Sequence, residues 1–294
     1  MPDGLKQRLA GHMLTPPMIT ITLLVENSAR GPGILGEHGL SWWIDTGTHR
    51  VLFDTGQGMA LTHNAARLGI DLALADAVVL SHGHYDHVGG LEAALALAPR
   101  AALFLHPRTI EPKFTGTDPA NARRLSTMFV ESESFRTAGR RIVASREPTE
   151  VVPGIWMTGE VPRTNDFEDT GGPFFLDPSL IRPDPLLDDQ AIYLPTPAGM
   201  IVVLGCAHAG MVNTLDRVAR LSGDAPVRAL LGGAHLENAS PRRMDETVRA
   251  LRSRQPVQMG FGHCTGLAAI RRFWSEFPGA CLQLHAGLRL RFSA

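Results

Sequence analysis

The sequence is poor in several residue types, and each shortage argues against a class of protein. It has only three cysteines, Cys206, Cys264 and Cys281, which form no Cys-x-x-Cys pair and predict no disulfide framework. Lys6 and Lys113 are its only lysines, so a Schiff-base lysine mechanism is not favoured. The net charge of −1 predicts neither a nucleic-acid footprint nor a patch for anionic membranes.

Long apolar runs are also missing from the sequence. None approaches the length that spans a membrane, and residues 1–17 lack the apolar core of a secretory signal, so we expect a cytoplasmic protein that contacts no membrane. The chain has no Gly-x-Ser-x-Gly motif, which argues against a serine hydrolase. A Gly-x-Gly-x-x-Gly motif at 31–36 precedes strand-like residues instead of a helix, and we interpret it as a loop.

The composition is typical of a globular protein with a large core. Hydrophobic residues make up 44% and charged residues 19% of the 294 residues. We expect one domain over residues 1–294. The periodicity weakens over residues 107–150 and 161–188, which predicts two insertions that act as lids or binding loops.

Hairpin-forming strands open the chain, and helices come between the later strands. This order predicts an α/β protein in which two β-sheets pack together with helices outside. The predicted strands are 18–25, 40–44, 50–53, 77–80, 101–105, 191–194, 200–204, 227–231, 257–260, 281–284 and 288–292. The predicted helices are 57–68, 91–98, 212–221, 242–252 and 265–276.

Four potential metal ligands fall within six residues, at His82, His84, Asp86 and His87. An apolar run before them predicts a buried strand and a helical pattern follows them, so the cluster lies on a strand-to-helix turn. His82 and His84, two apart in an extended segment, point to the same side. Imidazole nitrogens with a carboxylate suit zinc, iron or manganese, and the spacing is that of a metal site.

Three later strands each end in a histidine that follows small residues, at His208, His235 and His263. If a metal lies at the first turn, further ligands are expected at these strand ends. Cys206 and Cys264 flank two of these histidines. We interpret them as small buried thiols, with a reactive or ligating role as the alternative.

These motifs together resemble the metallo-β-lactamase fold superfamily. The resemblance covers nearly the whole chain and rests on the His-x-His-x-Asp-His turn, an upstream Asp-Thr-Gly and the strand-end histidines. Further segments resemble the branch that includes the dihydropterin-methyl-ribofuranosylaminobenzene phosphate synthases. These segments are 37–41, 54–57, 205–208 and 262–266.

The resemblance implies a four-layer αββα sandwich with metals at one edge between two mixed sheets. It also implies zinc as the first expectation, with iron or manganese as alternatives, at one or two ions per chain. Asp54 would hold the ligand loop through hydrogen bonds. By position, one ion would be held by His82, His84 and His208, and the second by Asp86, His87 and His263.

The chain departs from the family pattern at one position. Many hydrolases of the superfamily carry a metal-bridging aspartate at a strand end between the third and last histidine ligands. Here that strand ends in Gly233-Ala234-His235, so His235 would be a ligand or a substrate contact instead. We therefore predict Asp86, which would orient the nucleophile, and His235 as the catalytic residues.

Three further residues are candidates for contacts around the site. Arg163 could clamp a phosphate or carboxylate, with an ordinary surface ion pair to Glu160 as the alternative. His38 would either face the site or only cap the neighbouring hairpin.

The leading hypothesis is a metal-dependent hydrolase that directs activated water at an ester, phosphoester or lactone. The first alternative is a transferase that condenses a dihydropterin methyl diphosphate with an aryl ribose phosphate, and the second is a non-catalytic metal- or ligand-binding protein. The expected partner is a small-molecule substrate, phosphorylated or not. The oligomeric state stays open, with a homodimer as one option.

Overall fold

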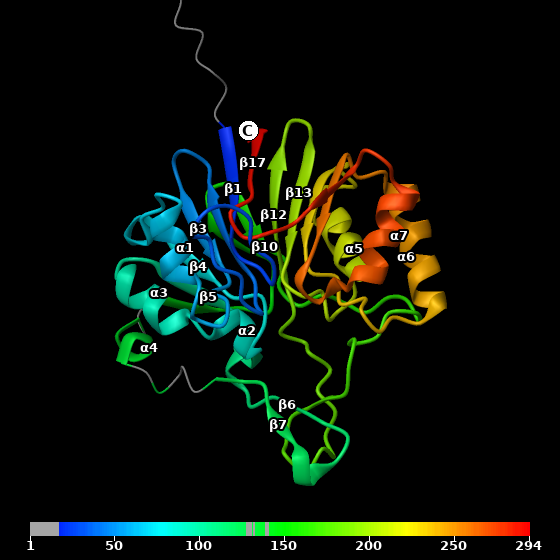
Figure 1. The fold of residues 1–294 in the computed structure, drawn as a ribbon, viewed down its shortest axis with the longest axis horizontal. Coiled ribbons are helices and arrows are strands. Elements are labelled where there is room, and N and C mark those ends of the chain that lie inside the picture. Colours follow the sequence, from blue (N-terminus) through cyan, green and yellow to red (C-terminus); the bar gives the residue numbers. More distant parts are fainter. Residues whose placement is uncertain (1–17, 128–130, 132, 139–140) are drawn as a thin grey trace, which may run out of the picture.

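Two large β-sheets, packed face to face, form the centre of the molecule (Figure 1). The structure is a computed structural model that describes residues 18–127, 131, 133–138 and 141–294. Each large sheet has seven strands, and a third sheet has three short strands. Of the helices in these residues, none is long and apolar enough to cross a membrane.

The first sheet combines an antiparallel half with a parallel half. Strands β17, β1, β2 and β3 pair antiparallel, whereas β3, β4, β5 and β8 pair parallel. Across this sheet the order is β17 (Arg289–Ser293), β1 (Met18–Val25), β2 (Ser41–Asp45), β3 (Arg50–Phe53), β4 (Ala77–Val79), β5 (Ala102–Leu105) and β8 (Ile142–Ala144).

The second sheet follows the same plan. Strands β13 to β16 pair parallel, and β9, β10, β12 and β13 pair antiparallel. Across this sheet the order is β16 (Cys281–Gln283), β15 (Gln258–Phe261), β14 (Val227–Gly232), β13 (Gly199–Leu204), β12 (Ala191–Thr196), β10 (Ile155–Met157) and β9 (Thr149–Val152).

Buried side chains separate four layers, because successive strand residues point to opposite faces. Trp42 and Ile44 of β2 lie in the core between the sheets, whereas Trp43 lies in the core under α1 and α3. A third core lies between the second sheet and α5, α6 and α7. The predicted αββα sandwich is confirmed. The covering helices are α1 (Leu61–Arg67), α3 (Leu91–Leu97), α5 (Met211–Ser222), α6 (Pro241–Arg254) and α7 (Leu267–Glu276).

The first covering helix is shorter than predicted, because a distant carboxylate takes the amides of its expected first turn. Glu37 accepts hydrogen bonds from the backbone N–H groups of four successive residues, 57–60, at 2.8–3.3 Å. Those residues therefore form a nest around Glu37, and the helix begins at Leu61.

A small lobe projects from one end of the sandwich, seen at the bottom of Figure 1. Its sheet has the order β11 (Phe174–Phe175), β6 (Phe114–Thr115) and β7 (Arg123–Arg124), so both predicted insertions contribute to it. The segment 107–150 holds more than the lobe. It also contains α4 (Glu133–Ala138) and the sheet-edge strands β8 and β9, so the part that lies outside the two large sheets is shorter than predicted.

Candidate metal centre

The predicted ligands converge where strand ends of the two sheets meet. Strand β4 leads through Ser81 into the short helix α2 (Tyr85–Val88), and His84 is the residue before that helix. The parallel strands β13, β14 and β15 end in the loops that carry the three later histidines. The turn is closely packed at Gly83, where a Cβ would lie 2.2 Å from the Thr109 carbonyl oxygen.

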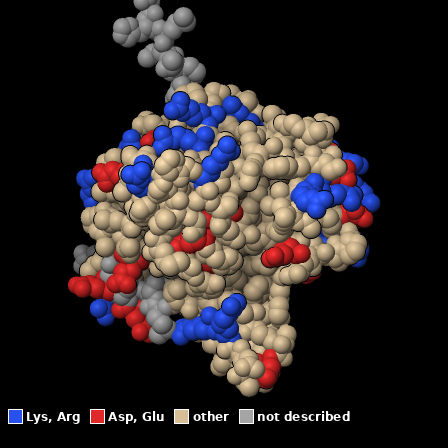
Figure 2. All heavy atoms as spheres, in the orientation of Figure 1, with Lys and Arg blue, Asp and Glu red and all other residues tan. Residues whose placement is uncertain are grey.

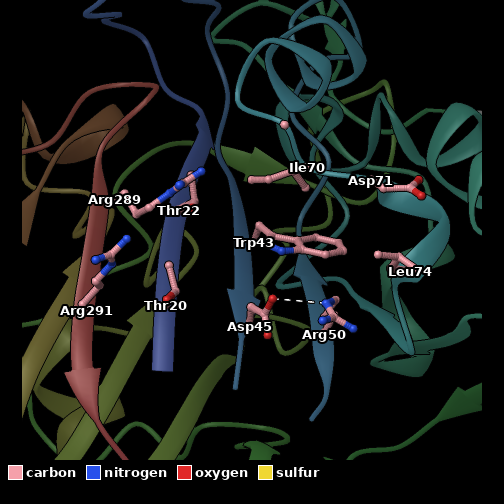
Figure 3. Close-up of a pocket in the computed structure, with 11 residues that line it drawn as sticks. Thr20, Thr22, Trp43, Asp45, Arg50, Ile70, Asp71, Leu74, Arg289 and Arg291 are labelled. Atoms are coloured by element: carbon pink, nitrogen blue, oxygen red, sulfur yellow. Dashed lines mark hydrogen bonds and ion pairs between the residues drawn. The ribbon is translucent and has the colours of Figure 1, made fainter. Parts of the chain in front are cut away.

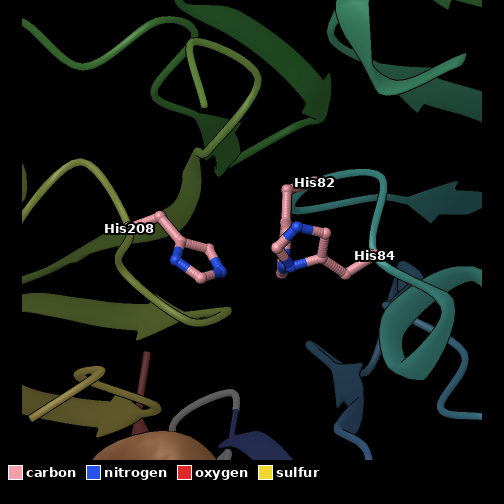
Figure 4. A group of neighbouring side chains, drawn as sticks. All are labelled: His82, His84 and His208. Carbon is pink, nitrogen blue, oxygen red and sulfur yellow. The ribbon is translucent and has the colours of Figure 1, made fainter. Parts of the chain in front are cut away.

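The first group of ligand atoms comes from both sheets. Nε2 of His82 lies 3.0 Å from Nδ1 of His84, and the ligand atoms of His82, His84 and His208 all lie within 4.8 Å of one another. Figure 4 shows His208 reaching toward the other two from the opposite side. Burial lowers the pKa of each of these histidines well below its usual value, so all three are neutral at pH 7 with lone pairs free for a metal.

The second group lies beside the first and contains a carboxylate. Nε2 of His263 lies 3.2 Å from Nε2 of His87 and 3.2 Å from Oδ2 of Asp86. The Asp86 oxygen in turn lies 3.8 Å from Nε2 of His87. His38 Nε2 approaches the same Asp86 oxygen at 3.3 Å. Burial would raise the pKa of Asp86, but the neighbouring His87, His263 and His38 outweigh it and hold that pKa well below its usual value. Asp86 is therefore a carboxylate at neutral pH.

Asp54 supports this arrangement from behind the ligands. One of its oxygens lies 2.7 Å from Nδ1 of His87 and accepts a hydrogen bond from the Ser81 hydroxyl at 2.7 Å, while the other accepts from the Ser81 backbone N–H at 2.7 Å. Burial disfavours the charged form of His87, but Asp54 and Asp86 outweigh burial and raise the pKa of His87 to about 9. The contact of Asp54 with Nδ1 of His87 orients Nε2 of His87 toward His263 and Asp86, as carboxylate–histidine pairs do at metal sites.

Both groups open onto a cavity of about 410 Å³. His84, Asp86, His208 and His263 lie in its wall, and further lining residues include Asn27, His38, Tyr85, Arg123, Phe174 and His235. The ring of His235 lies 4.3 Å from that of His208, centre to centre. Burial and the nearby Arg243 lower the pKa of His235 to about 4, so its imidazole is neutral at pH 7.

Glu160 and Arg163 lie outside the residues that line this cavity. Glu160 approaches the buried His106, with 3.5 Å between Oε2 and Nε2. Arg163 donates hydrogen bonds to the backbone carbonyls of His208, at 2.8 Å, and of Ala209 and Pro185. This placement favours support of the His208 loop over direct contact with a substrate.

Two further features lie beside the predicted ligands; the first has little signal in the sequence, whereas the second, Cys206, already stood out there as a thiol that flanks a histidine. Lys113 in the lobe is 1% exposed and pairs with Asp184 at 2.9 Å and Asp188 at 2.8 Å. Asp188 also accepts a hydrogen bond from the backbone N–H of Gly83, between two ligands. The second feature is the thiol of Cys206, whose Sγ lies 3.1 Å from Nε2 of His87. In the sequence, the one hint of the buried Lys113 is the rarity of lysine in a chain with many arginines.

A second hollow, of about 340 Å³, lies on the helix-covered side of the first sheet, away from the histidines (Figure 3). Trp43, Thr20 and Thr22 form its floor, and Arg289 and Arg291 of β17 lie along one side. Its Arg50 is paired with Asp45 at 3.1 Å. The lining of this hollow includes the carboxylates Asp45 and Asp71 but no histidine or cysteine, so we place the candidate site at the histidines.

Known proteins are similar to this chain in sequence and in fold. The model of the metallo-β-lactamase superfamily matches residues 35–176. The 7,8-dihydropterin-6-methyl-4-(β-D-ribofuranosyl)-aminobenzene-5′-phosphate synthase of Methanocaldococcus jannaschii is 32% identical over 266 residues, covering 87% of this chain and 90% of that protein. The chain belongs to the metallo-β-lactamase superfamily. Within the superfamily it resembles the branch that contains this synthase, as the sequence motifs predicted.

Solved structures of the superfamily agree with this placement. The crystal structure of Tm1679, described as a metal-dependent hydrolase of the β-lactamase superfamily, is 28% identical with a TM-score of 0.78, covering 94% of this chain and 100% of that one. Zn²⁺-bound PqqB from Methylobacterium extorquens is 17% identical with a TM-score of 0.52, covering 92% and 99% of the two chains. That second likeness concerns the fold alone.

The metallo-β-lactamase fold implies that a divalent metal is bound, and the residues present fit one. Nε2 of His208 is buried and has no hydrogen-bond partner among the described residues. The close approach of paired imidazole nitrogens, at 3.0 Å and 3.2 Å, suits lone pairs that converge on a cation. Imidazole, carboxylate and thiol donors are also the set that zinc and its neighbours prefer.

Proposed function

We propose that this protein is a metal-dependent hydrolase that acts on a small ester, phosphoester or lactone. The observation that carries the proposal is the convergence of two groups of buried ligand atoms on the wall of one cavity. In this proposal His82, His84 and His208 hold one ion and Asp86, His87 and His263 hold the second. Zinc is the first candidate because it favours nitrogen and sulfur donors, and iron and manganese are the alternatives.

The metal supplies Lewis acidity toward the substrate and lowers the pKa of the attacking water. The protein supplies orientation and charge. Asp86, ionised at neutral pH, accepts a hydrogen bond from the attacking water and directs it into the cavity. The neutral imidazole of His235 donates a hydrogen bond to the oxyanion that develops, without carrying a charge of its own.

Arg123 supports a substrate that carries an anionic group such as a phosphate. It lies on β7 of the lobe and lines the cavity, and its side chain has no hydrogen bond or ion pair with any residue that the structure describes. Figure 2 shows basic side chains gathered where the lobe joins the main body. A guanidinium in this position binds two oxygens of a phosphate or carboxylate at once.

The test compares metal-dependent turnover of two histidine variants. The protein is purified without added metal, its metals are identified by anomalous diffraction, and turnover is measured on a panel of phosphoesters, esters and lactones. His82→Ala should lose metal and turnover together, whereas His49→Ala, at the β2–β3 turn, should keep both. Full turnover by metal-free His82→Ala protein would refute the hydrolase proposal.

A second candidate function follows from the 32% identical synthase. In this alternative the same centre binds the diphosphate of a dihydropterin methyl diphosphate while an aryl ribose phosphate attacks its methyl carbon. Incubation with both compounds separates the two functions. A condensation product would support transfer, and release of diphosphate without condensation would support hydrolysis.

A further inference from the structure

The sulfur of Cys206 lies where the two ligand groups meet. Cys206 is 2% exposed and comes two residues before His208 in the loop after β13. Its Sγ and the ligand atoms of His82 and His87 all lie within 4.8 Å of one another, and the same limit holds for Cys206, His263 and Cys264. One sulfur is therefore within reach of residues from both proposed ion sites.

The backbone around Cys206 fixes this position. A Cβ at Gly205 would lie 2.3 Å from the Ser81 hydroxyl oxygen, so the loop packs directly on the residue that Asp54 holds. On the other side, the backbone N–H of Gly233 donates a hydrogen bond of 2.9 Å to the Gly205 carbonyl. The loop therefore has little room to carry the thiol away from the histidines.

The second thiol of the pair, Cys264, has a backbone partner. The Sγ of Cys264 lies 3.7 Å from the carbonyl oxygen of Cys206 and can donate its S–H there. By contrast, the Cys206 Sγ lies 3.1 Å from Nε2 of His87, the atom that also faces His263. Both thiols lie within 4.8 Å of the His263 ligand atom, but only Cys206 also lies within that limit of His82 and His87, whereas Cys264 has a backbone carbonyl for its S–H.

Charge gives an independent reason for a sulfur anion here. Two divalent cations would carry four positive charges into a buried site whose histidines, once bound to metal, are neutral donors. The Asp86 carboxylate contacts Nε2 of His263, and the Asp54 carboxylate contacts His87 only at Nδ1, the ring nitrogen that faces away from the other ligand atoms. A buried charge needs nearby compensation. Thiolate is also the donor that binds zinc and related ions most readily, and coordination removes the thiol proton outright.

We propose that the Cys206 thiolate is a metal ligand placed between the two histidine groups. This inference rests on the metal centre of the proposed function, but not on the reaction that it performs. On binding, the S–H bond breaks, its proton leaves to solvent, and the sulfur electron pair forms a bond to the metal, with no change in oxidation state.

The test uses Co²⁺ in place of the native metal and reads the sulfur–cobalt absorption in the near ultraviolet. Co²⁺-loaded wild-type protein should show this absorption, and Cys206→Ser should lose it together with part of the bound metal. Cys264→Ser and Cys281→Ser should keep it; Cys281 is a matched control because its Sγ lies near the Phe273 carbonyl, on α7. Zinc-edge X-ray absorption of wild-type protein, which needs no variant, should show one sulfur at about 2.3 Å.

Two results would overturn the assignment. The first is wild-type protein that binds metal without a sulfur signal by either method. The second is a signal that survives in Cys206→Ser and disappears in Cys264→Ser. Circular dichroism of the metal-free variants shows whether each is folded. Metal-dependent turnover with no sulfur signal would refute the Cys206 ligand and leave the hydrolase standing, whereas a sulfur signal without turnover would do the reverse.

Discussion

Replacing Lys113 by Met should strongly destabilise the protein, because it leaves two buried carboxylates without their cation. Lys113, Asp184 and Asp188 are 1%, 2% and 0% exposed, and both ion pairs are shorter than 3 Å. Burial would lower the pKa of Lys113, but Asp188 and Asp184 outweigh it and raise that pKa. The ammonium is therefore present throughout the neutral range, and its contribution is lost only as the pH rises through that raised value.

The magnitude follows from the burial of all three groups. Removing one partner of a buried ion pair costs roughly 3–5 kcal/mol, because the remaining charge is desolvated and unpaired. For a chain of this size, that corresponds to a fall in Tm of roughly 5–8 °C. The effect should extend to the metal centre, since Asp188 also holds the Gly83 amide between His82 and His84.

The assay is thermal and urea unfolding of metal-free protein at pH 7. Adding Asp184→Asn and Asp188→Asn to the Lys113→Met variant should recover part of the loss, because the amides are neutral and residue 188 can still accept from Gly83. The matched control is Arg242→Met, which breaks an exposed pair with Asp166 and should leave Tm unchanged. A Lys113→Met protein as stable as the wild type would refute the reasoning, as would a triple variant no more stable than Lys113→Met.

Three further predictions concern the site itself. Asp54→Asn should weaken metal affinity by about 10–100-fold in a chelator competition while the fold is retained, since the amide no longer orients His87 as an anion does; unchanged affinity would contradict this role. Arg123→Ala should raise KM for a phosphorylated substrate with little change in kcat, whereas Arg124→Ala, whose guanidinium bonds Ser126 outside the cavity lining, should not. Metal-free protein should lose stability as the pH falls from about 6.5 to about 4, because unfolding lets buried neutral histidines bind protons. His235→Asn should flatten this dependence by up to about 1.4 kcal/mol per pH unit in urea titrations, and an equally steep profile would show that His235 is not buried neutral.

Local patterns were sufficient to predict the fold and the first turn of ligands. The His82–His87 cluster lies within one strand-to-helix turn, so its spacing alone brings the side chains together. The later histidines were predicted to join them because each follows a strand and comes after small residues, and the structure brings His208 and His263 there. The strand predicted at 40–44 is β2, and the structure shows both of its faces covered.

Contacts between distant segments were not predictable in this way. The Glu37 carboxylate that delays the start of α1 to Leu61 is 20 residues or more from the amides that it binds. Lys113 pairs with carboxylates 71 and 75 residues away, and no periodicity marks such a partner. For Arg163 the sequence left a substrate clamp and a surface ion pair as alternatives, and its guanidinium instead donates to backbone carbonyls that become neighbours only in the folded chain.

The division of the ligands between the two sheets has a consequence for how the site is maintained. His82, His84, Asp86 and His87 follow the first sheet, whereas His208 and His263 follow the second. In the proposed centre neither half holds a complete ligand set, so metal binding there would stabilise the packing of one sheet against the other. The lobe adds a third connection, since Lys113 links the turn after β4 to the segment before β12. The lobe therefore both contributes to the cavity wall and connects the two halves of the site.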